Sequence, residues 1–124
     1  MPILNFNKKF SGKVRNGRKH HTIRAFRKFP IKPGDTLYLY TGLRTKYAKR
    51  LRIVTCSAIH LIKIRKSSIE ITICGTSGAV GMQKVWGAAR DNFAKSDGFT
   101  GWAEMKEWWL KVPGLPFTGQ LICW

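Results

Sequence analysis

A short segment near the start of the chain concentrates residue types that bind anions. Residues 16–30 contain five Lys or Arg residues and two of the three histidines. Its middle, His20 to Arg24, has the composition of a short strand, with basic residues before and after it. Lysine and arginine bind phosphate groups, and histidine can transfer a proton near neutral pH. The segment therefore predicts a cleft for an anionic ligand, with part of a nucleic acid as the first expectation.

Further cations and aromatic rings follow along the chain. Cations bind phosphates and aromatic rings stack on bases, which is how proteins hold single strands and flipped bases. We expect these side chains to gather on one face. The expected nucleic-acid-binding residues are Arg18, Lys19, Arg24, Arg27, Lys28, Tyr40, Arg44, Lys46, Tyr47, Arg50 and Arg52. The alternative is that the tyrosines pack on a sheet and the cations are only solvated.

The net charge of +17 is distributed unevenly along the chain. Residues 1–90 hold 20 Lys or Arg residues against only two acidic residues, Asp35 and Glu70. Charges of one sign at this density repel each other, so a polyanion that neutralises them stabilises the fold and releases counterions. A basic surface without a specific ligand remains the alternative.

Hydrophobic content and cysteine positions indicate one globular domain over residues 1–124. Hydrophobic residues make up 44% of the chain, and no apolar run reaches the about 18 residues typical of a membrane span. No signal peptide is expected at the N-terminus, so we expect a cytoplasmic protein without membrane contact. Cys56, Cys74 and Cys123 lie far apart in strand-like runs, which predicts buried free thiols. We expect no metal and no cofactor.

Hydrophobic periodicity predicts the elements that position these residues. Residues 50–65 are predicted to form one long strand, but the alternation of apolar and polar residues changes phase within it. A bulge or bend is therefore expected between Thr55 and Ala58. Lys32 to Asp35 has the composition of a turn with positive φ at Gly34. The other expected strands are 3–6, 20–25, 36–41, 69–74 and 116–124, with one or two helical turns over 8–15.

The region after residue 74 is expected to be a loop followed by helices. Residues 75–81 predict a flexible connector, and residues 84–95 predict a helix. Thr100 is the expected N-cap of a second helix, whose apolar stripe is Trp102, Met105 and Trp109. The order of elements favours an α+β fold: a small mixed β-barrel of five or six strands, with a short early helix and two late helices.

The motifs resemble those of the ASCH domain, a PUA-like small β-barrel associated with RNA. The resemblance rests on Gly17-Arg18-Lys19 leading into Thr22-Ile23-Arg24, and on Lys32-Pro33-Gly34-Asp35 opening a strand. Asp97-Gly98-Phe99 before an amphipathic helix and a final apolar strand add to it. Together these motifs cover most of the chain. The resemblance implies RNA in preference to DNA as the partner.

The chain is most similar to a branch of this family that removes the acetyl group from N4-acetylcytidine. In that branch a Lys and a Thr lie three residues apart, which matches Lys19 and Thr22, and the third residue is a Glu. Asp97 is the matching carboxylate here and is one methylene shorter. The resemblance implies Thr22 as nucleophile or water-orienting group and Lys19 as base with its pKa lowered by neighbouring cations. Asp97 would position or shuttle the proton.

Three functions remain open at this point. The first is nucleic-acid binding, in which Lys19 clamps a phosphate, Thr22 is an ordinary strand residue and Asp97 belongs to a turn. The second is hydrolysis of a modified nucleoside or of RNA by Lys19, Thr22 and Asp97. The third is a mobile-element protein whose basic face binds an acidic host protein. His20 and His21 are expected to be mostly structural, since neighbouring strand residues point to opposite faces.

Overall fold

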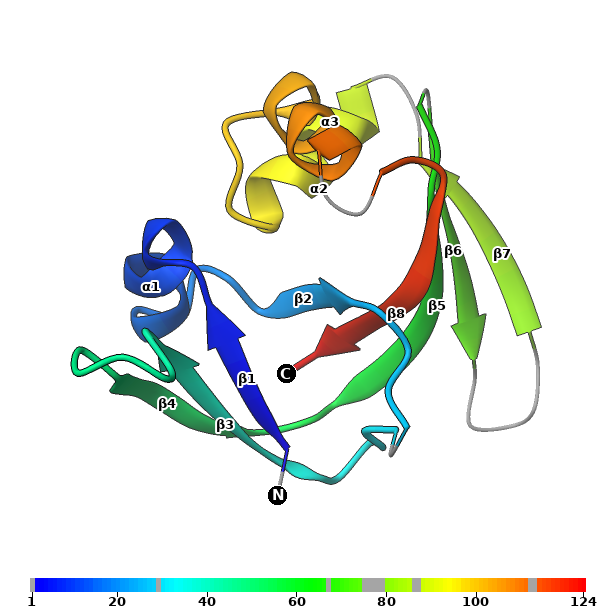
Figure 1. Ribbon diagram of the computed structural model, residues 1–124. Helices are drawn as coiled ribbons and strands as arrows, with labels where there is room; N and C mark the ends of the chain where they lie inside the picture. The colour runs from blue at the N-terminus through cyan, green and yellow to red at the C-terminus, as the bar shows by residue number, and fades with distance from the viewer. Residues whose placement is uncertain (1, 29, 67, 75–79, 86–87, 112–113) are drawn as a thin grey trace.

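The strands of the protein form two separate sheets. The computed structural model describes residues 2–28, 30–66, 68–74, 80–85, 88–111 and 114–124, with the backbone alone at 73–74 and 80–85. The smaller sheet has the order β1-β3-β4, and the larger has the order β2-β8-β5-β6-β7 (Figure 1). Strand bounds are β1 (Ile3–Phe6), β2 (His21–Arg24), β3 (Thr36–Thr41), β4 (Lys49–Thr55), β5 (Ala58–Ile64), β6 (Ile69–Cys74), β7 (Val80–Val85) and β8 (Phe117–Cys123).

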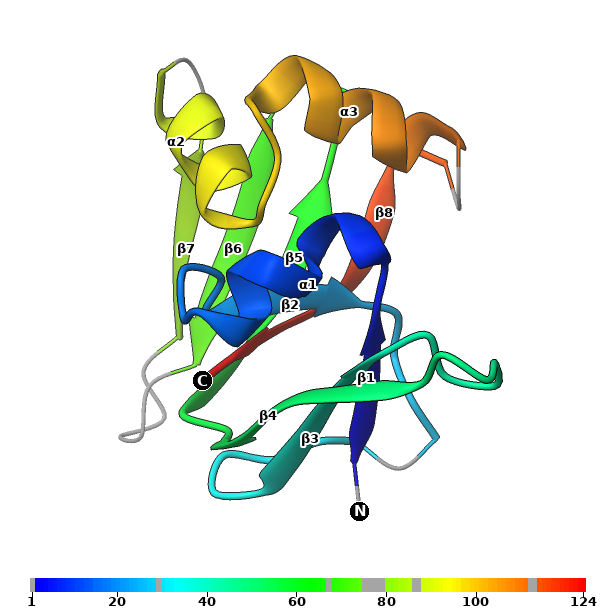
Figure 2. The same cartoon turned by 90° about the vertical axis from the view of Figure 1, so that its left-hand side faces the viewer.

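Three helices cover the sheets in the described part of the chain. The helix bounds are α1 (Lys8–Arg15), α2 (Ala88–Ser96) and α3 (Trp102–Lys111). Helix α1 packs on β3 and β4 of the smaller sheet, whereas α2 and α3 pack together over the larger sheet (Figure 2). The Asn7 side chain begins α1 by accepting a hydrogen bond from the Lys9 N–H (3.0 Å). No described helix combines the length and the apolar character that crossing a membrane requires.

The α+β prediction is confirmed, but the prediction of one barrel of five or six strands is wrong. The expected long strand over 50–65 is interrupted at Cys56 and Ser57, inside the expected region. Its first half, β4, is an edge strand of the smaller sheet, and its second half, β5, lies inside the larger sheet. The alternation changes phase because the chain passes from one sheet to the other at this point. Leu51 and Ile62 are accordingly buried in different cores.

Strand β8 separates two hydrophobic cores. Leu121 belongs to the core under α2 and α3, and its neighbour Ile122 belongs to the core under α1. Successive residues of a strand point to opposite faces, so one strand can serve two cores at once. Helix α1 also contributes to both, through Phe10 to the first core and Val14 to the second. The region where the two cores meet is where the candidate site lies.

The prediction of a helix over residues 84–95 is wrong in its first part. Residues Val80–Val85 form β7, which pairs antiparallel with β6, and the helix α2 begins at Ala88. The register joins Val85 to Ile69 and Lys84 to Glu70. Pairing with an existing strand edge outweighed the weak helical periodicity of this segment. Most of the expected loop, 75–79, lies outside the described residues.

Several local predictions are confirmed. The strand expected over 69–74 forms as β6 and pairs antiparallel with β5, and the Asp35 N–H donates to the Lys32 carbonyl oxygen (3.1 Å) with Gly34 at φ 94°. The α3 stripe of Trp102, Met105 and Trp109 is buried. The prediction that Thr100 caps α3 is wrong. Asp91 caps the helix, because its Oδ1 accepts a hydrogen bond from the Trp102 N–H (2.8 Å).

The described cysteines are free thiols. Cys56 is buried, and Cys123 is half-buried. Burial raises the pKa of both thiols. The side chain of Cys74 lies outside the described residues. Among the residues that the structure describes, no three His, Cys, Asp or Glu side chains gather as a metal site would require.

Candidate functional site

A small cavity of about 200 Å³ lies where the two cores meet. Its polar lining consists of Asn5, Lys19, Thr22, Arg24 and Asp97, and its apolar lining is dominated by the aromatic rings of Phe6, Phe10, Phe99, Trp108 and Trp109. The three residues that the sequence singled out for catalysis therefore reach one cavity. They come from the segment before β2, from β2 itself and from the turn after α2.

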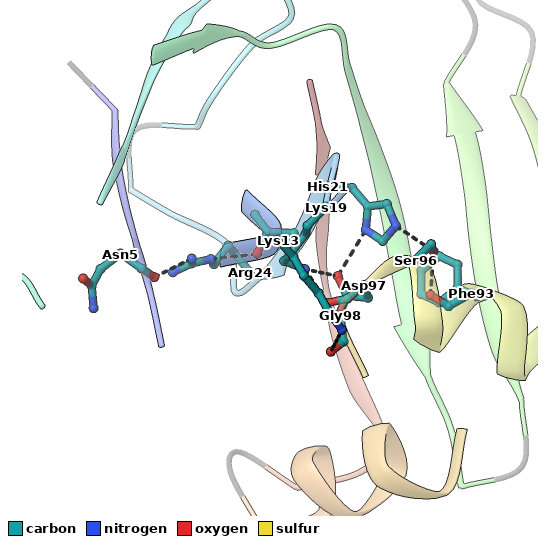
Figure 3. A network of polar contacts seen from close by, with 10 residues as sticks. Asn5, Lys13, Lys19, His21, Arg24, Phe93, Ser96, Asp97 and Gly98 are labelled. Carbon is teal, nitrogen blue, oxygen red and sulfur yellow. Dashed lines mark hydrogen bonds and ion pairs between the residues drawn. The ribbon is translucent and has the colours of Figure 1, made fainter. Parts of the chain in front are cut away.

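Lys19 is buried and faces the turn after α2. It precedes β2, as expected for a side chain that must reach in from the loop, and its N–H donates to the Lys13 carbonyl oxygen (3.0 Å). Only 3% of Lys19 is exposed. Its Nζ donates to Asp97 Oδ1 (2.5 Å) and to the Asp97 carbonyl oxygen (2.7 Å), as Figure 3 shows. One ammonium group thus holds both the side chain and the backbone of Asp97.

Gly98 allows this turn to approach α1 closely. Its φ is +103°, and a Cβ at this position would lie 2.6 Å from Phe10 Cδ1. A second bond holds the same turn, since Lys13 Nζ donates to the Gly98 carbonyl oxygen (3.0 Å; Figure 3). Lysines at the end of α1 and just beyond it therefore fix the turn that carries Asp97.

Burial lowers the pKa of Lys19, and Asp97 opposes this change by stabilising the ammonium form. Arg24 and Lys13 lower the pKa of Lys19 further, by smaller amounts. The pKa of Lys19 is therefore lowered, as expected, but the main cause is desolvation rather than the neighbouring cations. At a given pH, an amine whose pKa is lowered is more often neutral than an exposed lysine is, and only the neutral amine can accept a proton.

Thr22 lies in the same cavity but bonds to a different partner. It is buried on β2, and its Oγ1 accepts from Arg24 Nε (3.2 Å). Arg24 Nη2 also donates to the Asn5 carbonyl oxygen (2.6 Å), which ties β2 to the end of β1. Within the described ranges, no hydrogen bond joins Thr22 to Lys19 or Asp97. The cavity thus places the three residues around one space, with Lys19 and Asp97 in contact and Thr22 apart from them.

His21 extends the polar network on the α2 side. Its Nδ1 lies 3.2 Å from Asp97 Oδ1, at ion-pair distance but without hydrogen-bond geometry. Its Nε2 lies 3.1 Å from Ser96 Oγ, and its ring stacks on Phe93 with centroids 5.2 Å apart. His20 is exposed on the other side of the chain. Sequence reasoning treated both histidines as mostly structural and missed the contact with Asp97, because that contact depends on the position of α2.

Trp109, one of the residues that line the cavity, carries an unsatisfied donor. Only 9% of this residue is exposed, and its Nε1 has no hydrogen-bond partner within the described part of the protein. A buried donor without a partner is costly, so such groups are uncommon in folded proteins. The sequence assigned this tryptophan to the core or its rim, which the burial confirms, but no local pattern indicated its place in the cavity.

The expected basic residues do not gather on one face. Tyr40 and Arg50 are cross-strand partners of β3 and β4, so they share a face, whereas Arg52 pairs with buried Leu39 on the opposite face. Lys19 and Arg24 line the cavity. The remaining residues lie in connecting segments: Arg18 after α1, Arg27 and Lys28 after β2, and Arg44, Lys46 and Tyr47 between β3 and β4.

A larger groove of about 740 Å³ lies between α1 and the segment that joins β3 to β4. Its cations are Lys8, Arg15 and Lys49, none of which the sequence singled out, and Tyr47 is its one expected member. A signal was present in the sequence, because residues 8–15 carry four basic side chains and no acidic one. We call this space the α1 groove.

Comparisons of the chain with protein-family models, curated proteins and solved structures found no match. The resemblance to ASCH domains therefore rests on the sequence motifs alone. The chemistry of the cavity and of the α1 groove provides the basis for a functional proposal.

Proposed function

We propose that this protein is an ASCH-type domain that binds nucleic acid, RNA in preference to DNA, and that its cavity receives one unpaired base. The observation that carries this proposal is the cavity itself, which combines five aromatic rings with a few polar groups. Pockets for drug-sized ligands span about 300–1,000 Å³. A space of about 200 Å³ is smaller than that and suits a single planar ring.

The polar groups of the cavity match those that read an unpaired base. Enzymes and binding proteins hold a flipped base by stacking and by hydrogen bonds to its edge. The unpaired Trp109 N–H can donate to a base carbonyl oxygen, and Arg24 at the wall can bind the adjoining phosphate. Single-stranded RNA offers unstacked bases and is the usual target of sequence-specific RNA-binding proteins. A cytoplasmic location agrees with this partner.

The test measures fluorescence anisotropy of a labelled single-stranded RNA 12-mer, with DNA of the same sequence in parallel. Binding should weaken steeply with salt, with log K falling by about 0.7 per phosphate neutralised for each decade of salt. The double variant Arg24→Ala/Arg27→Ala should bind several-fold more weakly than Lys66→Ala/Lys95→Ala, which removes two exposed cations that do not line the cavity. Absent or salt-insensitive binding rejects the proposal, and tighter binding to an acidic protein than to RNA favours the third function.

A second function, hydrolysis of an acylated nucleoside such as N4-acetylcytidine, is favoured by one specific observation. Lys19, Thr22 and Asp97 line the same cavity, and the pKa of Lys19 is lowered. Thr22 Oγ1 accepts a hydrogen bond from Arg24 Nε, so the hydroxyl proton of Thr22 can still be donated. Neutral Lys19 would take that proton while Oγ1 attacks the amide carbonyl carbon. Asp97 would relay the proton to the exocyclic nitrogen as the C–N bond breaks, and water would then release the acyl group from Thr22.

This second function is tested by incubating N4-acetylcytidine, free and within RNA, with the wild type and with Lys19→Ala. The expected result is release of acetate by the wild type and its loss in the variant. Thr22→Val, which removes only the hydroxyl group, should also lose turnover. No turnover by the wild type, or equal turnover in the wild type and Lys19→Ala, removes the hydrolase from consideration and leaves the binding function intact.

A further inference from the structure

We propose that the α1 groove is a polynucleotide track, which binds phosphates and one stacked base next to the nucleotide in the cavity. This inference rests on the proposed function and names its ligand as a single-stranded RNA segment rather than a free nucleoside. The groove was not expected from the sequence, where the cations were assigned to other segments.

The cations of the groove are available to a ligand. Lys8 and Arg15 lie at the two ends of α1, Lys49 begins β4, and all three are exposed. None of them has an acidic partner among the described residues, although Lys9 of the same helix pairs with Glu104 (2.8 Å). No Asp or Glu lines the groove. Three unneutralised cations around one concave surface form a site for consecutive phosphates.

Tyr47 supplies a stacking surface at the edge of the groove. It is the most exposed of the large apolar side chains described, at 74%. Its segment is held in place, because the Leu43 N–H donates to Asn5 Oδ1 (3.1 Å) and the Tyr47 N–H donates to Thr45 Oγ1 (3.1 Å). An aromatic ring on an anchored segment stacks on a base without ordering of the backbone, and its π face accepts any base.

The groove and the cavity share a wall. Asn5 and Phe6, at the end of β1, line both spaces. Arg24 lies at the same junction, since its guanidinium donates to the Asn5 carbonyl oxygen (2.6 Å) and lies 4.9 Å from the centre of the Phe6 ring. A polynucleotide that places one base in the cavity can therefore continue past Arg24 into the groove. A free nucleoside would leave the groove empty.

The experiment compares two charge-matched triple variants, using anisotropy with the RNA 12-mer and calorimetry with cytidine monophosphate. The groove variant is Lys8→Ala/Arg15→Ala/Lys49→Ala, and the control is Lys32→Ala/Lys66→Ala/Lys95→Ala. All six positions are exposed, so both proteins should fold, which circular dichroism verifies. The groove variant should reduce the salt slope of 12-mer binding by about 2, from three contacts at about 0.7 each. The control should keep the wild-type slope. Tyr47→Ala should weaken 12-mer binding by about 5- to 150-fold.

The outcomes separate this inference from the proposed function. If the wild type binds neither the 12-mer nor cytidine monophosphate, the proposed function fails and the inference fails with it. If the wild type binds both, but the groove and control variants show the same salt slope, the track is refuted while the function stands. Polyglutamate binding as tight as RNA binding, with no effect of Tyr47→Ala, would also overturn the track. It would show a site for any polyanion.

Discussion

At the scale of single residues, the buried pair of Lys19 and Asp97 is the centre of the site. Its two partners are 78 positions apart in the chain, and Asp97 also contacts His21. Burying two charges is costly unless they are paired and hydrogen-bonded, and here Lys19 binds both the carboxylate and the backbone oxygen of Asp97. The arrangement keeps a titratable amine in an aromatic cavity, where either phosphate binding or proton transfer can use it.

The pKa of Lys19 should fall further in Asp97→Asn. Burial lowers this pKa and Asp97 raises it, so removing the carboxylate charge removes the opposing effect. The measurement is an NMR titration of the Lys19 Nζ and Cε signals in the wild type and the variant. An unchanged or higher pKa in Asp97→Asn would contradict the assigned causes.

The same shift has a consequence for stability. Between the lowered pKa of Lys19 and the unfolded value of 10.5, the unfolded chain binds more protons at this lysine than the folded chain does. The contribution of Lys19 to the free energy of unfolding should therefore increase as the pH rises through this window, and it is lost as the pH falls.

At the scale of elements, the turn after α2 and the helix α1 position the site together. The turn carries Asp97, while α1 provides Phe10 and Lys13 as the surface against which it packs. Gly98 is required there for two reasons, its positive φ and the close approach to Phe10. Neither reason is visible from the composition of the segment.

Gly98→Ala should destabilise the fold by at least about 2 kcal/mol, because overpacking alone costs about 1–3 kcal/mol and positive φ adds strain. The matched control is Gly12→Ala in α1, where nothing lies within 4 Å of the added Cβ. That control should be stabilising by about 0.5–1 kcal/mol, as alanine favours helix interiors. Urea unfolding measures both variants, and equal stabilities would refute the role given to Gly98.

Asp91 is expected to be a stabilising cap of α3, although it lies in the preceding helix. Its Oδ1 accepts from the Trp102 N–H at the start of α3 (2.8 Å). Asp91→Ala should lower the free energy of unfolding by about 0.5–2 kcal/mol. Glu107→Ala, which removes an exposed pair with Lys111 (3.7 Å), should cost only about 0.5 kcal/mol or less. A larger loss in Glu107→Ala than in Asp91→Ala would contradict this assignment.

At the scale of the whole molecule, charge sets the conditions under which the fold is most stable. The net charge is +17, and the described ion pairs involve only a few of the 23 Lys and Arg residues. The unpaired cations repel each other at low ionic strength, and salt screens them over about 8–10 Å at 0.10–0.15 M. We therefore expect counterions to contribute to the stability of the protein.

The melting temperature should rise as NaCl increases from 20 to 200 mM at pH 7. RNA at 100 times its Kd should add about 2.7 kcal/mol to the free energy of unfolding through binding to the folded state. Thermal unfolding followed by circular dichroism measures both effects. A melting temperature that falls with salt would show that attractive ion pairs, rather than repulsion, dominate the charge interactions.

The sequence alone was sufficient for features that arise within a few residues. The strand over 36–41, the helical turns over 8–15 and the buried stripe of α3 were each predicted from local residue patterns, and each forms. The break near Cys56 was also visible, because a change of phase in the alternation is a local property. The motifs around Lys19 and Thr22 pointed to β2, a strand that lines the cavity.

Only the tertiary structure decided that there are two sheets, that 80–85 is a strand and that the site is a cavity at their junction. These features depend on contacts between distant segments, such as Asp97 with Lys19 or Val85 with Ile69. Local periodicity carries no information on which distant edge a segment meets. The packing of distant segments alone places Trp109 in the cavity. It also brings Lys8, Arg15 and Lys49 into one groove.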